Sequence, residues 1–506
     1  MGAKGAGCQG GPVLAVPAGD GPGSTRRRVL PRIAAASSAG GSKSRPLPTT
    51  VRTTRSPGRS SHSQGLRLVI AAMTQATKGR RPRLRSVLTG IGLVAFGFVL
   101  AIGVGVTYYQ VSRGRAAPPP QPVGYEPADR VVDATHYRLA VTEWALPAES
   151  GLPKLAMVGD RLLVASSAGD LAYLDPAEAF VPPTESAPSR AVSPMKLERL
   201  TLAIPTDMEV FAAAKIVAHE SFGVGDLHVE PRADGGHDLY ASFGKVLESG
   251  CMVLRVAVAE AFDGPTPAQW RTLFDSQPCF PVAWPADRIA GRMRIEGGTL
   301  YVTVGYNGID EDYIANGNPT GENPQSEGNS YGKIVAIDLA SGVARVVSKG
   351  HRNPQGLYIS PDGTIFETEH GPRGGDELNR IVPGGNYGWP VVTYGSAYRQ
   401  HSWPPSPRQN SHDGYDEPVF AWVPSIATSE IVGLEDPGFG AWQGDLLVAT
   451  LKGEAVHRLH LEDGRVVVDE PVPLGRRLRD MVLDGSTIYL STDDDRLLRV
   501  RLLPAD

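Results

Sequence analysis

The sequence DGTIFETE, residues 362–369, starts with two turn-forming residues and continues with two apolar residues before acidic and hydroxylated ones. Asp and Gly favour tight turns, whereas Ile and Phe favour β-strands. The same order of a turn, two or three apolar residues and then mostly small or hydroxylated residues recurs along the chain. The six apolar segments are residues 162–164, 239–241, 300–302, 365–367, 446–448 and 488–490. Each copy predicts a short strand that follows a turn.

The spacing of these copies indicates a ring of small β-sheets. Successive copies lie 42 to 81 residues apart, so each unit is too small to bury a sheet alone. Stacked units closed in a ring solve this problem, and a propeller blade needs four short strands. We therefore predict an all-β, six-bladed β-propeller over residues 131–506. Pairing of RLLRVRLL (496–503) with YRLAVTEW (137–144) would remove its open edges. A β-sandwich with a further domain is the alternative.

The N-terminal part of the chain differs from the rest in composition and charge. Residues 1–115 contain 18 Lys and Arg and one acidic residue, whereas the remainder contains 32 Lys and Arg and 53 Asp and Glu. The acidic body argues against a nucleic-acid partner, since phosphate binding needs basic surface. The basic segment 1–85 is predicted to be disordered, because its first 72 residues are rich in Gly, Ser, Pro and Arg without periodicity. Met73 is a candidate alternative start of the chain.

An uncharged apolar run at residues 86–112 predicts a membrane anchor. As a helix it could span a hydrocarbon core of about 30 Å, and a buried core helix is the alternative. Five cations lie just before the run and two follow it, which predicts a single-pass protein with a cytoplasmic N-terminus and a periplasmic or extracellular C-terminal domain. The run is long for a signal peptide and lacks an obvious cleavage site, so we expect it to remain uncleaved.

Two features of the exported part follow from this topology. Residues 113–130 form a Pro-rich linker between the anchor and the propeller. Cys251 and Cys279 lie in the exported part, where the compartment permits a disulfide but the sequence does not show one.

Polar residues surround one of the repeated strands in an unusual assortment. In HRNPQGLYISPDGTIFETEHGPRGGDELN, residues 351–379, Arg352 and Asn353 precede the expected strand and HGPRGGDELN follows it. Loops of this kind cluster at the mouth of a propeller's central channel, where ligands bind. A polar turn whose acids face water is the alternative.

A second group of cations lies near the C-terminus. Lys452 stands beside an expected strand, and Arg477 and Arg479 are two residues apart, so both point to one face while Arg476 points away. Guanidinium groups bind carboxylates through paired hydrogen bonds, so these cations suit a small ligand with several carboxylates. Salt bridges within an acidic protein are the alternative. Convergence of the three cations on Gly371 would favour the ligand site over an interaction scaffold.

Six motifs in the C-terminal half resemble a known enzyme family. They are GHRNPQGL, TEHGPRGGDELN, PGGNYGWP, VPSIA, LKG and RLRD, in this order within residues 291–506. Together they are similar to the soluble quinoprotein glucose/sorbosone dehydrogenases, also called aldose sugar dehydrogenases. The likeness over residues 128–280 is limited to strand patterning. The resemblance implies a six-bladed propeller that binds pyrroloquinoline quinone (PQQ) and Ca²⁺ and oxidises an aldose or related sugar at its anomeric carbon by hydride transfer.

The resemblance also implies roles for individual residues. The residues implied in cofactor binding are Asn353, Gly371, Pro372, Lys452, Arg477 and Arg479. The residues implied in metal binding are Gly371 and Pro372 through their carbonyls, for the Ca²⁺ beside the quinone, and Glu377 and the Tyr387 carbonyl, for a structural Ca²⁺. Arg352 and His370 are the candidate catalytic residues. A sugar would be the substrate, and the electron acceptor is left open.

The sequence departs from this family at the general base. The family uses a histidine supported by an aspartate, but in DRIAGRMRIEGGTLYVTVGYNG (287–308) Arg288 and Tyr306 stand where these are expected. Arginine stays protonated and cannot be a general base. Three interpretations remain: oxidation with another base, for which His370 and Glu369 are nearest in sequence; binding of quinone or sugar without turnover; or a shifted correspondence through this stretch.

Overall fold

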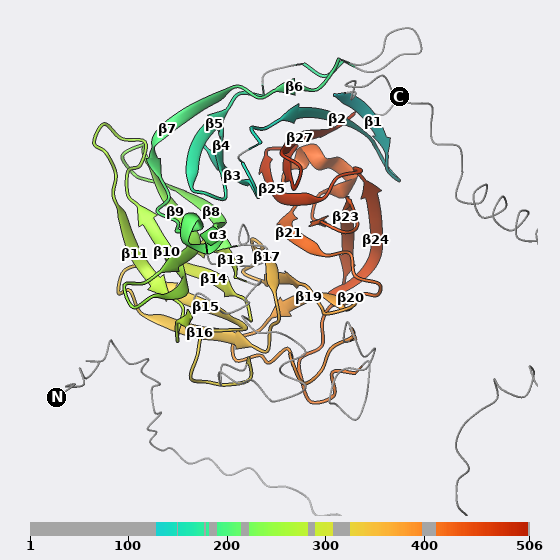
Figure 1. The fold of residues 1–506 in the computed structure, drawn as a ribbon. Coiled ribbons are helices and arrows are strands. Elements are labelled where there is room, and N and C mark those ends of the chain that lie inside the picture. Colours follow the sequence, from blue (N-terminus) through green and yellow to red (C-terminus); the bar gives the residue numbers. More distant parts are fainter. Residues whose placement is uncertain are drawn as a thin grey trace, which may run out of the picture. The chain divides into compact units, whose positions relative to one another are not determined.

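The computed structural model confirms the six-bladed β-propeller (Figure 1). It describes residues 128–503, apart from 149, 177–178, 182–189, 214–221, 282–288, 307–323 and 397–410. The predictions on the basic segment, Met73, the apolar run, most of the linker and Arg288 fall outside these residues. Within the described part of the chain, no helix is both long and apolar enough to span a membrane.

Each blade is an antiparallel sheet whose innermost strand comes first, except that β6 joins the sixth blade in parallel. The strands of the first three blades are β3 (Lys154–Val158), β4 (Arg161–Ala165), β5 (Asp170–Leu174) and β7 (Leu197–Ala203); β8 (Val224–Pro231), β9 (His237–Val246), β10 (Cys251–Ala259) and β11 (Trp270–Asp275), with β12 (Phe280–Pro281) at the edge; and β13 (Ala290–Glu296), β14 (Thr299–Val304), β15 (Lys333–Asp338) and β16 (Ala344–Lys349). Figure 1 shows the innermost strands around the centre of the ring.

The last three blades continue the same order. Their strands are β17 (Pro354–Ile359), β18 (Ile365–Glu369), β19 (Asp376–Ile381) and β20 (Phe420–Trp422); β21 (Thr428–Gly433), β22 (Leu446–Thr450), β23 (Ala455–Glu462) and β24 (Arg465–Pro473); and β25 (Leu478–Asp484), β26 (Thr487–Thr492) and β27 (Arg496–Leu502), joined by β2 (Arg138–Ala145), β1 (Asp129–Asp133) and β6 (Ser193–Pro194). Outside the sheets lie a short helix, α3 (Met208–Ala213), and a 3₁₀ helix, η2 (Pro437–Trp442).

The repeated sequence pattern marks one strand of each blade. All six apolar segments fall on the second strands, namely β4, β9, β14, β18, β22 and β26. These strands read as nearly continuous apolar runs because neighbouring blades cover both of their faces. The predicted ring closure is also confirmed: β2 pairs with β27, from Leu139 opposite Leu502 to Ala145 opposite Arg496.

The hydrophobic core is divided among the blade interfaces. Between the second and third blades, for example, Leu254 and Val256 of β10 pack with Leu300 and Val302 of β14. Similar buried clusters lie between the other neighbouring pairs of blades among the described residues. Because every blade is packed on two sides, the loops between its strands are held by a rigid frame.

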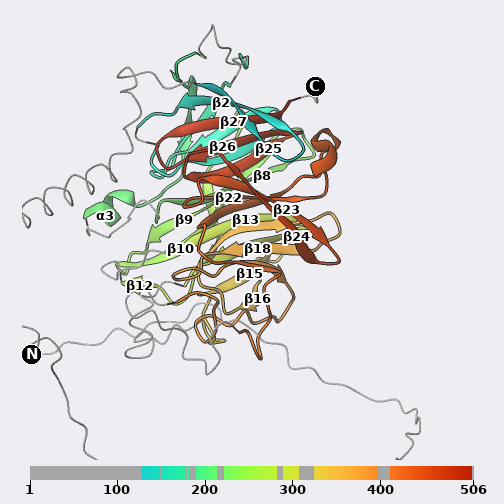
Figure 2. The same ribbon diagram turned by 90° about the vertical axis from the view of Figure 1, so that its right-hand side faces the viewer.

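We call the face at which the innermost strands begin the front face. The innermost strands β3, β8, β13, β17, β21 and β25 contact one another in sequence around the axis. Helix α3 precedes β8 and stands out from one side of the ring in Figure 2, so this side is the front face. The connections between the second and third strands of each blade return to the same face.

The two cysteines of the described region form a disulfide, a question that the sequence left open. Cys251, the first residue of β10, is bonded to Cys279 with a sulfur–sulfur distance of 2.03 Å. The bond closes a loop between residues 28 positions apart at the edge of the second blade.

Candidate functional site

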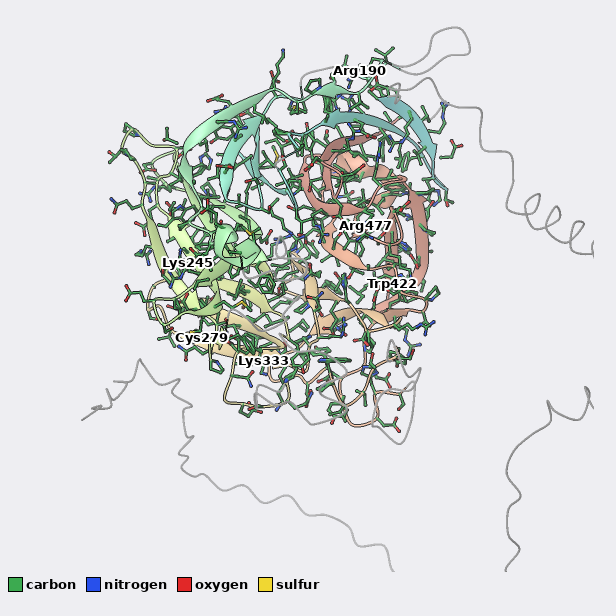
Figure 3. The ribbon with its side chains drawn as sticks, viewed as in Figure 1. Arg190, Lys245, Cys279, Lys333, Trp422 and Arg477 are labelled. Atoms are coloured by element: carbon green, nitrogen blue, oxygen red, sulfur yellow. A yellow bond between two sulfur atoms is a disulfide. The ribbon has the colours of Figure 1, made fainter. Side chains whose placement is uncertain are left out.

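The predicted site residues come from three consecutive blades and lie at the front face. The fourth blade carries Arg352, Asn353, His370, Gly371, Pro372, Glu377 and Tyr387; the fifth carries Lys452; and the sixth carries Arg477 and Arg479. Figure 3 shows Arg477 among the strands of the two C-terminal blades. The ring therefore brings together segments that the chain keeps far apart.

Arg352 directs its guanidinium group at main-chain oxygens of the neighbouring loop. Its Nη1 donates to the carbonyls of His370, at 3.0 Å, and Gly371, at 2.9 Å. Its main-chain N–H donates to Glu369 Oε2 at 2.6 Å, and its side chain lies over the ring of Trp389 at 5.3 Å. The Gly371 carbonyl, a predicted Ca²⁺ ligand, keeps a second lone pair for a cation.

His370 is engaged through both ring nitrogens. Nε2 lies 2.5 Å from the Thr428 carbonyl, which can only accept, so Nε2 carries the proton. Nδ1 lies 3.3 Å from the Asn353 amide nitrogen and is then the acceptor. Burial lowers the pKa of His370, and the charges of Arg352 and Arg479 act in the same direction. In this arrangement neither ring nitrogen of His370 is free to take a proton from a substrate.

Asp376 organises the loop around Gly371, a role that the sequence did not reveal. This fully buried carboxylate accepts from the Gly371 N–H at 3.0 Å through Oδ1. Its Oδ2 accepts from the N–H groups of Ile426 and Ala427, at 2.9 and 2.6 Å, in the fifth blade. A Cβ at Gly371 would lie 2.2 Å from the Gly374 carbonyl oxygen, so no other residue fits this turn.

Lys452 is tied to the same turn through its main chain. Its N–H donates to the Ile426 carbonyl at 3.0 Å, and the Ile426 N–H donates in turn to Asp376. The Lys452 side chain is exposed at the front face. Asp376 therefore links the position of Lys452 to that of Gly371.

Arg477 and Arg479 share a single carboxylate, Asp493, which the sequence analysis did not identify. Arg477 Nε donates to Asp493 Oδ2 at 2.8 Å, and Arg479 Nε donates to Asp493 Oδ1 at 2.8 Å. Arg476 points away and contacts Asp494 and Glu143, as its position one residue out of phase predicts. Burial lowers the pKa of Arg479, and the Asp493 charge opposes this shift. The fork of these two arginines therefore donates to one carboxylate of the protein, the salt bridge that was the alternative interpretation, and its other N–H groups suit a further carboxylate.

A cluster of buried oxygens lies behind the Gly371 loop. Glu367 and Glu369 of β18 stand opposite Asn379 and Glu377 of β19 in the sheet register. Asn379 Nδ2 donates to Glu367 Oε2 at 3.1 Å and to Glu377 Oε2 at 3.5 Å. Glu367 Oε1 and Asn379 Oδ1 are buried and have no hydrogen-bond partner among the described residues. We call Glu367, Glu369, Glu377 and Asn379 the oxygen cluster.

The buried carboxyl groups of the oxygen cluster are difficult to ionise unless a cation lies beside them. Burial and the neighbouring carboxylates raise the pKa values of Glu367 and Glu369 well above their usual range. His351, whose Nδ1 lies 3.7 Å from Glu367 Oε2, cannot neutralise them, because burial and Lys333 lower its pKa to about 3. The Tyr387 ring stacks on His351 at 4.8 Å. Buried carboxylate and amide oxygens of this kind are the hard ligands that Ca²⁺ prefers.

The residues at the expected positions of the general base are only partly described. Tyr306 is buried, and its N–H donates to the Arg352 carbonyl at 2.8 Å. Its ring centre lies 6.3 Å from that of Trp389. Tyr306 therefore helps to hold Arg352, while Arg288 lies outside the described residues.

Several proteins are similar to this chain in sequence, and solved structures are similar to it in fold. Aldose sugar dehydrogenase YliI of Escherichia coli (strain K12) is 29% identical over 309 residues, which cover 56% of this chain and 78% of that protein. Quinoprotein glucose dehydrogenase B of Acinetobacter calcoaceticus is 27% identical over 282 residues, which cover 41% and 59%. A crystal structure of glucose dehydrogenase is 26% identical with a TM-score of 0.55, covering 72% of this chain and all of that one.

A family model extends the match over most of the propeller. The Glucose / Sorbosone dehydrogenase model matches residues 159–499, from the first blade to the last strand, β27. The resemblance inferred from the six C-terminal motifs is thereby confirmed. This chain belongs to the glucose/sorbosone dehydrogenase family.

Proposed function

We propose that this chain oxidises an aldose or related sugar at its anomeric carbon with PQQ as the cofactor and Ca²⁺ as the metal ion. The observation that supports the proposal is that Arg479 acts electrostatically on His370, the residue before Gly371, while Arg352 binds the Gly371 carbonyl. The contact between His370 and Thr428 links this loop to the fifth blade. A flat anion with several carboxylates fits this arrangement of donors.

The residues of this chain would divide the work as follows. Lys452, Arg477 and Arg479 would bind the carboxylates of the quinone, and Asn353 would donate at its edge. The carbonyls of Gly371 and Pro372 would hold the Ca²⁺ beside it, with Arg352 fixing the Gly371 carbonyl at 2.9 Å. The chemistry that such a quinone supplies when bound is that of a hydride acceptor, and the adjacent cation would promote the hydride transfer. The oxygen cluster with the Tyr387 carbonyl would hold the second, structural Ca²⁺.

A second candidate function is binding of quinone or sugar without turnover. The contacts of His370 favour it, because both ring nitrogens are occupied. Glu369, the other acid nearby in sequence, accepts from the Arg352 N–H at 2.6 Å and is buried. Under the enzymatic proposal, His370 must exchange its Asn353 contact for a substrate hydroxyl before it can act as a base.

Dye reduction by the purified full-length chain separates the two candidates. With PQQ, Ca²⁺ and a panel of aldoses, we expect reduction of an artificial electron acceptor that depends on all three additions. A change in the quinone absorption spectrum without sugar-dependent reduction would favour the binding protein. Absence of both signals would overturn the proposed function.

We further propose that the propeller is exported and held at the membrane by the apolar run 86–112, with the N-terminus in the cytoplasm. The Cys251–Cys279 disulfide supports an oxidising compartment, since disulfides are rare in the cytosol. The natural electron acceptor would then be a membrane or periplasmic component.

Thiol labelling tests this topology. In spheroplasts that express the Cys251→Ser variant, a membrane-impermeant maleimide is expected to label Cys279, whereas the wild-type chain stays unlabelled there because both sulfurs are bonded. Labelling of the variant only after the membrane is permeabilised would place the propeller inside the cell. The double variant Cys251→Ser/Cys279→Ser controls for labelling elsewhere in the chain.

A further inference from the structure

The innermost strands of the propeller meet around one buried arginine. Arg292, the third residue of β13, is 1% exposed. Each of its five N–H groups has an acceptor: Nε donates to the Gln355 carbonyl at 2.8 Å, Nη1 to Asp226 Oδ1 at 3.0 Å and Asp480 Oδ1 at 2.5 Å, and Nη2 to the carbonyls of Ser429 at 2.6 Å and Arg479 at 3.2 Å. Only guanidinium has this number of donors in one plane.

The contacts of Arg292 reach every blade. Its acceptors lie in the second, fourth, fifth and sixth blades, and Arg292 itself belongs to the third. The first blade joins through the Leu155 N–H, which donates to Asp480 Oδ2 at 2.7 Å. Arg292 and its partner Asp480 therefore connect all six innermost strands.

The acids around Arg292 are paired with arginines of the protein itself. Glu430 Oε2 lies 2.7 Å from Arg292 Nη1, so three carboxylates surround this guanidinium. Arg294 adds a second cation, with Nη2 3.2 Å from Glu430 Oε1. Two arginines therefore lie within ion-pair distance of these three carboxylates.

The main-chain acceptors of Arg292 are carbonyl groups in the segments that carry the front-face residues. Gln355 also donates through Nε2 to Asn353 Oδ1 at 2.9 Å. Ser429 follows Thr428, whose carbonyl binds His370. The third acceptor is the carbonyl of Arg479 itself, so Arg292 contacts the immediate supports of Asn353, His370 and Arg479.

A second path runs from Arg292 through Thr303. The Arg292 N–H donates to Thr303 Oγ1 at 3.0 Å, and this hydroxyl donates to the Pro354 carbonyl at 3.1 Å. Pro354 directly follows Asn353. The third blade thus holds two consecutive carbonyls at the start of β17.

We infer that Arg292 is a positioning residue for the cofactor site, which holds Asn353, His370 and Arg479 in register from beneath. The inference rests on the proposed function for the identity of the ligand. It differs from a purely structural role in its consequence: loss of the Arg292 donors should loosen three front-face segments selectively, beyond any loss of global stability.

Arg292→Lys keeps the positive charge but removes the planar guanidinium group whose N–H groups bind the three carbonyls. Arg458→Lys is the matched control, because Arg458 is also buried and binds two carboxylates, Asp445 at 2.6 Å and Glu470 at 2.8 Å, away from the front-face segments. For the full-length chain we expect Arg292→Lys to weaken PQQ binding about 10-fold in an absorbance titration at a temperature where it is folded. Arg458→Lys should keep the wild-type Kd although it also loses stability.

Hydrogen exchange gives a readout that does not need the quinone. Arg292→Lys is expected to speed amide exchange in peptides covering residues 352–356, 428–431 and 478–481 more than elsewhere, and Arg458→Lys is not. If the wild-type chain binds no quinone, the proposed function fails while this measurement still tests the role of Arg292. Uniformly faster exchange, or a folded Arg292→Lys variant with an unchanged Kd and unchanged exchange at these segments, would overturn the inference.

Thr303→Val serves if Arg292→Lys does not fold. It conserves the shape of a fully buried side chain and removes only the path to Pro354. We expect about 3-fold weaker quinone binding and faster exchange confined to residues 352–356. Unchanged exchange at this segment would contradict the proposed path.

Discussion

Replacement of Arg479 with alanine is expected to weaken quinone binding by roughly 100-fold, since truncating one partner of a buried, hydrogen-bonded charge pair costs about 2–5 kcal/mol. Arg479 is the more buried member of the arginine fork, with a side chain that is 15% exposed against 48% for Arg477. Its charge also acts on His370 in the facing loop. An absorbance titration of the full-length chain with PQQ in the presence of Ca²⁺ would measure the loss.

Arg476→Ala is the matched control for this experiment. Arg476 lies one residue before Arg477 but binds Asp494 and Glu143, each at 2.7 Å, on the other side of the strand. Glu143 keeps Arg130 as a partner at 2.8 Å, so the control leaves no unpaired buried acid. Equal losses of affinity in the two variants, or none in Arg479→Ala, would contradict the assignment of the fork to the quinone.

Removal of Ca²⁺ is expected to lower the free energy of unfolding by about 3 kcal/mol when the free ion had been near 100 times its dissociation constant. The physical reason is the oxygen cluster, where three carboxylates are buried together and burial raises the pKa values of Glu367 and Glu369. Thermal unfolding with Ca²⁺ or with chelator would show the effect. In Glu377→Gln, one charged ligand is lost, and the difference between the two conditions should largely disappear.

Glu430→Gln is the control for the metal prediction. Glu430 belongs to the other buried acidic group, where Arg292 and Arg294 supply the positive charge. This variant should therefore keep the full stabilisation by Ca²⁺, whatever its own stability. A wild-type chain that unfolds at the same temperature with and without chelator would contradict the proposal of a structural Ca²⁺ site.

Local sequence was enough to predict the blades. The six apolar segments lie on the second strands. A strand that is covered on both faces needs a continuous apolar run, and the polar residues before and after this run mark its ends. The same local period predicted that Arg477 and Arg479 would point to one face while Arg476 turned away, and both arginines contact Asp493 in the salt bridges that were the alternative to a ligand site. Both predictions need only alternation along one strand.

Side-chain contacts between distant segments were beyond the reach of the sequence. Asp376 appeared as one acid among several in a polar turn, yet it is buried and joins the Gly371 turn to residues of the fifth blade. His370 appeared as a candidate base, and its engagement by Asn353 and Thr428 depends on a strand of the next blade. Glu367 joined the predicted ligand Glu377 only because the β18–β19 register sets Glu367 opposite Asn379.

Composition and periodicity alone predicted the blade number and the ring closure, because these properties depend on the chemistry and alternation of neighbouring residues. Arg292 illustrates what only the tertiary structure decided. In sequence it is one of two arginines in a short strand, GRMRIE, and such arginines usually face solvent. It became the buried centre of the ring because the acceptors for its five N–H groups come from four other blades, and their convergence arises only when the propeller closes.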